Sequence, residues 1–321
     1  MSIPNVPYDV PEELNDPNGD IVLRSSDQVD FRVFRWPLQR LYPVFSDMFH
    51  LPNPPTSSEP STPPVVQMDE TAPVIEALLR LSYPIAPPTI KDPHIIALVI
   101  EAIVKLQAEQ QCRWWIRSTT ETMATVNPWA MYAILLASGR KACGYNFEDE
   151  IRIAARSTVG QQVIRPWKEA SMITAADYDR LLVYHSDCRS TFLGSEEAVW
   201  GNAGVYWSWF RSHGVFQSHC PAREIIAVGN QNYEVSPWFS EFRTKAKEAF
   251  SRDLRGQAIE DTGLWCPSLF RDLQAKLVCH ACARSATLQM PVYGKLLSAF
   301  MEETISRVTS SFNLSIIHVG C

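Results

Sequence analysis

Residues 20–49 constrain the fold more than any other stretch of the chain, because a strand-type and a helix-type hydrophobic pattern follow each other directly. Residues 21–23 are an apolar run, residues 25–28 are polar, and residues 29–33 alternate between apolar and polar side chains. Alternation with a period of two is typical of a strand with one buried face, and a short polar stretch between two strands is typical of a hairpin. The sequence therefore predicts a β-hairpin here.

The second part of this stretch predicts an amphipathic helix. Its apolar residues recur at intervals of three and four, which places them on one helical face. They are Leu38, Leu41, Val44, Phe45, Met48 and Phe49. Neither the hairpin nor the helix contains a catalytic grouping. A segment of this kind builds a scaffold or an interface, and this expectation guides the interpretation of the remaining chain.

The order of these patterns resembles the start of a BTB/POZ domain. Asp20 opens the first strand, Phe31 and Val33 give a Phe-x-Val second strand, and residues 45–49 end the helix with Phe-x-x-Met-Phe. Two further segments support the resemblance. Residues 75–84 are similar to the third helix of the domain, which ends in Leu-x-x-x-Tyr, and residues 132–156 are similar to the closing helices of BTB proteins common in mushroom-forming fungi.

The resemblance covers about the first half of the chain and implies an α+β fold. We expect a flexible tail over residues 1–18 and a BTB/POZ-like domain over 19–160, in which a short-stranded sheet is flanked by a helical cluster. Residues 51–64 are rich in proline and read as a solvated loop. Residues 161–321 read as an all-helical domain. Asn127-Pro128 and Thr174–Asp177 have the pattern of helix starts.

The chain departs from the family at two positions of the first domain. Phe34 stands where the family usually has a histidine, and Tyr42-Pro43 stands where it usually has a small Ser-Pro pair. In the family, the aspartate that matches Asp20 lines a charged pocket at the dimer groove together with that histidine. Arg32 and Arg35 are the candidates to replace it. The implied interface set is Asp20, Phe31, Val33, Phe34, Leu38, Leu41, Phe45, Met48 and Phe49.

Composition excludes several classes of function. The 321 residues are 46% hydrophobic and carry a net charge of −6 without any basic run, which argues against nucleic-acid binding. Residues 1–17 have no positive region followed by an apolar stretch, so a signal peptide is not expected. Residues 95–106 are too short for a membrane span and are interrupted by Glu101 and Lys105. We expect an intracellular protein, cytoplasmic or nuclear, that does not bind membranes.

The second half of the chain contains a set of candidate zinc ligands. His185 and Cys188 are three residues apart, His219 precedes Cys220, and a Cys-x-x-Cys pair follows later. Residues three apart share a helical face, and zinc takes four nitrogen or sulfur ligands in a closed structural site. BTB proteins of this fungal type often carry cysteines at similar places. The predicted set is Cys188, Cys220, Cys279 and Cys282, with His185 and His219 as substitutes.

Two alternatives remain open for these residues. Free cysteines are among the most buried residue types, so the same set is compatible with plain core packing. A zinc ion with an open position would instead be catalytic, and the chain would be a zinc-dependent enzyme with its site in the helical domain.

The chain contains no nucleophile elbow, Walker loop, His-Glu-x-x-His motif or dinucleotide fingerprint. We therefore expect a non-enzymatic protein–protein interaction module that forms a homodimer or binds a partner protein. Family analogy adds a role as adaptor for a cullin-type ubiquitin ligase.

Overall fold

The computed structural model describes residues 8–51, 63–142, 147–161, 168–194, 224–228, 231–235, 244, 248, 295 and 298–312. These residues divide into two compact units. Unit 1 contains the described residues up to Ala154 together with 168–173, and unit 2 contains residues 155–161 and the described residues from Thr174 onwards.

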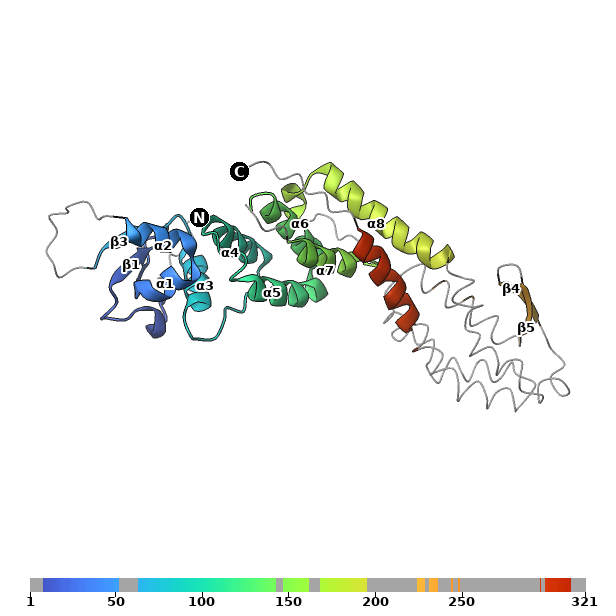
Figure 1. The fold of residues 1–321 in the computed structure, drawn as a ribbon, viewed down its shortest axis with the longest axis horizontal. Helices are drawn as coiled ribbons and strands as arrows, with labels where there is room; N and C mark the ends of the chain where they lie inside the picture. Colours follow the sequence, from blue (N-terminus) through green and yellow to red (C-terminus); the bar gives the residue numbers. More distant parts are fainter. Residues whose placement is uncertain are drawn as a thin grey trace, which may run out of the picture. The chain divides into compact units, whose positions relative to one another are not determined.

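Unit 1 combines helices with a small mixed sheet, so the expected α+β class is confirmed. Its elements are η1 (Glu12–Leu14), β1 (Ile21–Arg24), β2 (Asp30–Val33), α1 (Arg35–Leu41), α2 (Pro43–His50), β3 (Val65–Gln67), α3 (Ala72–Ser82), α4 (Pro93–Lys105), α5 (Arg113–Val126), α6 (Pro128–Gly139) and η2 (Lys168–Met172), shown in Figure 1. α7 (Glu148–Thr158) contains the boundary between the units.

β1 is the central strand of the sheet, whose order is β2-β1-β3. β2 pairs with it antiparallel, with Ile21 opposite Val33, and β3 pairs with it parallel, with Val22 opposite Val65. A strand with a neighbour on each side and covered faces is apolar throughout, which explains the run from Ile21 to Leu23. The predicted hairpin is confirmed, whereas the three-residue strand β3 was not predicted.

The predicted single helix over residues 38–49 is wrong, because the chain forms two helices that meet at Tyr42. Tyr42 has φ −110° and ψ 107°, which is an extended conformation. The cause is Pro43, which has no backbone N–H and disfavours helical geometry in the residue before it. Pro43 is instead the first residue of α2, a position that proline tolerates well.

The expected flexible tail is wrong for residues 8–18, and residues 1–7 lie outside the described part. Leu14 is fully buried, and the Tyr8 ring lies 6.2 Å from the Phe31 ring. The Tyr8 hydroxyl donates a hydrogen bond to Glu76, and the backbone N–H of Asp16 donates to the carbonyl of Arg32 at 2.8 Å. The segment has prolines and acids, but two large side chains anchor it.

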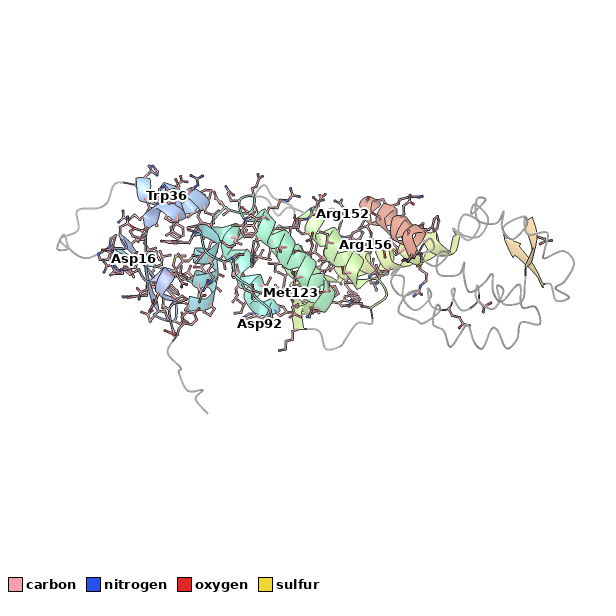
Figure 2. All side chains as sticks on the ribbon, turned by 90° about the horizontal axis from the view of Figure 1, so that it is seen from below. Asp16, Trp36, Asp92, Met123, Arg152 and Arg156 are labelled. Atoms are coloured by element: carbon pink, nitrogen blue, oxygen red, sulfur yellow. The ribbon has the colours of Figure 1, made fainter. Side chains whose placement is uncertain are left out.

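The helical cluster of unit 1 is built around α6, which is buried nearly all round. α4 and α5 both contact α6, and α4 also contacts α3. Asn127 accepts the backbone N–H of Ala130 at 3.2 Å, which confirms the predicted helix start at Asn127-Pro128. The Asp92 carboxylate caps α4 in the same way, because it accepts the backbone N–H of His94 at 2.9 Å. Met123 of α5, labelled together with Asp92 in Figure 2, is buried.

Unit 2 contains α8 (Ala175–Gly194), which begins at the predicted capping box. The backbone N–H of Thr174 donates to the Asp177 carboxylate at 2.8 Å, and the Asp177 N–H donates back to the Thr174 hydroxyl at 3.3 Å. The buried face of α8 contains Leu181, Tyr184 and Cys188. Leu182 lies outside this face and is 44% exposed.

The expectation of an all-helical second domain is wrong. β4 (Glu224–Val228) and β5 (Gln231–Val235) form a two-stranded antiparallel sheet, with Ile226 opposite Tyr233. The β-branched residues Ile225, Ile226 and Val228 favour a strand, and Gly229-Asn230 is a dipeptide typical of two-residue hairpin connections. This local pattern outweighs the helical character of the flanking sequence.

Candidate functional site

Four residues of the predicted interface set are buried in the core of unit 1. Phe31, Val33, Leu38 and Phe45 are between 0% and 3% exposed, so their side chains pack inside the unit instead of facing a partner. The remaining members lie at or near the surface: Leu41, Met48 and Phe49 are half-buried, and Asp20 and Phe34 are exposed.

The start of α1 is fixed by two side chains that are distant in sequence. The Asp20 carboxylate accepts the backbone N–H of Arg35 at 2.8 Å, and the Tyr83 hydroxyl accepts the N–H of Phe34 at 2.7 Å. The first N–H groups of a helix have no partner within it, so both contacts satisfy donors that would otherwise face water. Burial raises the pKa of Tyr83, which keeps its hydroxyl protonated. Asp20 and Tyr83 therefore set where α1 begins.

Two pairs of an aromatic ring and an arginine lie on the surface that α1 and α2 form. The Arg40 guanidinium lies 5.8 Å from the Trp36 ring centre, and the Arg35 guanidinium lies 5.4 Å from that of Phe49. Trp36, which is labelled in Figure 2, is 65% exposed. Phe34 is 36% exposed. We call Phe34, Arg35, Trp36, Arg40 and Phe49 the aromatic–arginine patch.

A stack of aromatic rings connects the patch to the core. Phe49 stacks on Phe45 at 5.7 Å, and Phe45 meets Tyr42 edge to face at 6.0 Å. Tyr42 is fully buried, and its hydroxyl donates to the carbonyl of Leu78 at 2.7 Å. This hydrogen bond gives the hydroxyl of the buried Tyr42 side chain a partner. The surface residue Phe49 is consequently held by a rigid support.

Neither candidate for the missing histidine forms an ion pair with Asp20 within the described residues. Arg35 contacts the Asp20 carboxylate through its backbone, and its guanidinium reaches only the Asp20 carbonyl at 3.5 Å. The Arg32 side chain donates to the carbonyl of Gly19 at 3.1 Å. The charged pocket implied by the resemblance is therefore not built from these arginines.

Only two of the predicted zinc ligands, His185 and Cys188, belong to the described residues. Thr158 donates its hydroxyl hydrogen to Ala155, so the contact of 2.8 Å between Thr158 and His185 is made by an Nε2–H of the imidazole. Burial lowers the pKa of His185 to about 4 and raises that of Cys188 to about 11. Cys220, Cys279, Cys282 and His219 lie outside the described residues.

Within the described residues, no group of three His, Cys, Asp or Glu side chains comes together to hold a metal ion. His185 and Cys188 are each held by a neighbouring hydroxyl, of Thr158 and Tyr184 respectively. Zinc binding by the predicted set therefore stays a prediction.

A separate titratable pair lies between α4 and α5. Glu109 is 6% exposed, and burial raises the pKa of its carboxyl. Burial, reinforced by the nearby Glu109, raises the pKa of the Cys112 thiol to about 12. Cys112 is therefore a neutral, unreactive thiol at physiological pH. This pair is suited to packing and not to nucleophilic chemistry.

Sequence reasoning missed Trp36 and Arg40, which are both exposed members of the patch. The signal was present: Trp36 lies outside the apolar stripe of the predicted helix, and Arg40 follows it by four residues, the spacing that places a cation over a ring.

Among the described residues, no helix has the length and apolar character that crossing a membrane requires. The chain matches no family model, and no curated protein or solved structure matches it.

Proposed function

We propose that unit 1 is a BTB/POZ-like protein-interaction module and that the aromatic–arginine patch is its contact surface. The observation that carries this proposal is the 65% exposure of Trp36. Exposed tryptophan contributes a large apolar area when a partner covers it, and Trp and Arg are enriched among the residues that dominate binding energy at interfaces. The aromatic stack beneath Phe49 supports the proposal further, because a rigid surface loses little entropy on binding.

The order of elements supports the family part of the proposal. The hairpin, the helical segment that follows it and α3, which ends beside Tyr83, come in the order that the resemblance implies. The non-enzymatic character, the intracellular location, the adaptor role for a cullin-type ubiquitin ligase and the structural zinc are proposed on the resemblance.

The test compares the full chain with Trp36→Ala and with a matched control, Trp114→Ala. Trp114 is 54% exposed on α5, so both substitutions remove a similar exposed ring. Self-association is measured by light scattering over a range of concentrations, and partner binding by selection from a displayed peptide library. We expect Trp36→Ala to abolish the oligomer or the selected binding and Trp114→Ala to preserve it. If both variants behave like the parent chain in both assays, the patch is not a contact surface.

A further inference from the structure

Arg35 and Arg40 differ from other arginines of unit 1 in their partners. Arg24, Arg80, Arg117 and Arg152 each form an ion pair with a carboxylate. Within the described residues, Arg35 and Arg40 form none, and their guanidinium groups lie over the rings of Phe49 and Trp36 instead. In a chain with a net charge of −6, these two guanidinium groups are cations that no carboxylate pairs with among the described residues.

The hydrogen-bonding capacity of Arg35 is also largely unused. Among the described residues its buried Nε has no hydrogen-bond partner, and Nη2 donates to the Asp20 carbonyl at 3.5 Å. A partner's carboxylate cannot reach the buried Nε, but it can bind the terminal amino groups of the half-buried Arg35 through charge-assisted hydrogen bonds.

The surroundings of Trp114 provide an internal comparison. This tryptophan is also exposed and also lies beside arginines, but Arg117 pairs with Glu121 at 3.1 Å and Arg113 pairs with Asp149 at 2.7 Å. Among the described residues, exposed tryptophan and arginine thus occur together around both Trp36 and Trp114. The arginines around Trp114 pair with neighbouring acids, whereas Arg35 and Arg40 do not.

We propose that the aromatic–arginine patch binds an acidic segment of a partner protein. Carboxylates of that segment pair with Arg35 and Arg40, and an apolar or aromatic side chain covers Trp36. Arginine suits this role because its planar guanidinium can bind a carboxylate through two parallel hydrogen bonds while it stays stacked on a ring. The inference rests on the proposed function and adds the chemistry of the partner.

Two other occupants fit the charges less well. A second copy bound through the same patch would place Arg35 and Arg40 opposite like charges, because a two-fold interface brings each surface against itself. A nucleic acid needs a larger cluster of cations than two arginines to neutralise its phosphates.

The test begins with selection of binders to the full chain from a library of random dodecapeptides, with counter-selection against Trp36→Ala. We expect the selected peptides to combine Asp or Glu with at least one aromatic residue. The dissociation constant of a selected peptide, measured by fluorescence anisotropy, should rise roughly tenfold or more with Arg40→Gln, because a charge-assisted contact is lost. Arg117→Gln serves as the control and should leave it unchanged.

Charge reversal separates a specific carboxylate contact from loss of folding. Arg40 is exposed, so Arg40→Glu should keep the melting temperature of the parent chain. The same substitution should weaken binding of the acidic peptide and strengthen binding of a version in which Lys replaces Asp and Glu.

The remaining outcomes each overturn a defined statement. Peptides that need Trp36 but carry no acidic residues, or that tolerate Arg40→Gln, would overturn the acidic partner and leave the proposed function standing. A dimer that needs Trp36, found when no peptide is selected, would also overturn the acidic partner and leave the proposed function standing. If a single-stranded oligonucleotide binds as tightly as the selected peptide, the partner is a nucleic acid and not an acidic protein segment. No selected peptide and no Trp36-dependent oligomer would overturn both proposals.

Discussion

The Asp20 carboxylate accepts the backbone N–H of Arg35 at 2.8 Å, so the residue that opens β1 caps the start of α1. The two residues lie on either side of the β1–β2 hairpin. Their contact connects the position of the hairpin to the orientation of the helix that presents Trp36. Asp20 thus has a structural role in the described part of the chain.

Replacing Asp20 by Ala should lower the free energy of unfolding by about 1 kcal/mol, the usual cost of removing a helix cap. Urea denaturation monitored by circular dichroism measures this change. Asp47→Ala is the control, because Asp47 is an exposed aspartate of α2, and its effect should stay within about 0.5 kcal/mol. Equal midpoints for the two variants would show that the Asp20 contact contributes nothing to stability.

The close approach of Gly19 to β2 yields a second prediction. A Cβ atom at residue 19 would lie 2.8 Å from the backbone nitrogen of Val33 and 2.9 Å from the carbonyl carbon of Arg32. Both are backbone atoms, so the strand itself would have to move. We expect Gly19→Ala to lower the free energy of unfolding by about 1–3 kcal/mol. Asn18→Ala, at the adjacent exposed residue, should have a much smaller effect in the same urea titration, and similar effects would refute the steric explanation.

The sequence predicted the parts of unit 1 whose hydrophobic period is undisturbed. The alternation through Phe31 and Val33 identified β2, and the Asn127-Pro128 pair identified the start of α6. β3 has three residues and pairs parallel at the edge of the sheet, so it is too short to show a period. The break at Tyr42 was missed because the apolar spacing continues across it, and Pro43 was compatible with a helix start.

The candidate site was only partly predictable, for a physical reason. An apolar stripe on a helix gives the same pattern whether it faces its own core or a partner, so Leu38 and Phe45 were placed with the interface although they are buried. Trp36 and Arg40 lie outside the stripe. Whether an arginine has a carboxylate beside it depends on tertiary contacts, and single-sequence patterns contain no such information.

The buried carboxyl of Glu109 should make the stability of the chain depend on pH. Burial raises its pKa in the folded state above the ordinary value of 4.5. Between the unfolded and the folded pKa the folded state binds more protons, so the contribution of Glu109 to stability is fully present below pH 4.5 and is lost as the pH rises through its folded pKa. Glu109→Gln should therefore raise the urea midpoint at pH 7 and have little effect at pH 4.

Glu121→Gln provides the control for this titration, because Glu121 is exposed and pairs with Arg117. Its effect should not increase with pH. If Glu109→Gln lowers the urea midpoint at pH 7, the carboxylate is stabilised in the folded state and the direction of the pKa shift is wrong.

The zinc proposal predicts different effects for substitutions of two buried cysteines. Cys112 and Cys188 are both free and buried, but only Cys188 belongs to the proposed ligand set. Native mass spectrometry should detect one zinc ion per chain in the parent protein and in Cys112→Ala, and none in Cys188→Ala or after chelation. Loss of a structural zinc should also lower the melting temperature. A metal-free parent chain would show that these cysteines are core residues.

The contact between Tyr184 and Thr309 should stabilise unit 2 through a directional hydrogen bond. The Thr309 hydroxyl donates its hydrogen to the carbonyl of Ile305 at 2.7 Å, so Tyr184 must be the donor in its 2.7 Å contact with Thr309. The Tyr184 ring also lies 4.6 Å from that of Phe312, which a phenylalanine at 184 would preserve. Tyr184→Phe keeps the ring and removes the hydroxyl together with its contacts to Thr309 and Cys188, which should cost about 1 kcal/mol. A double-mutant cycle with Thr309→Val isolates the Tyr184–Thr309 contact and should give a coupling energy of about 0.5–1.5 kcal/mol, measured by urea denaturation. Additive effects would mean that the two hydroxyl groups do not interact in solution.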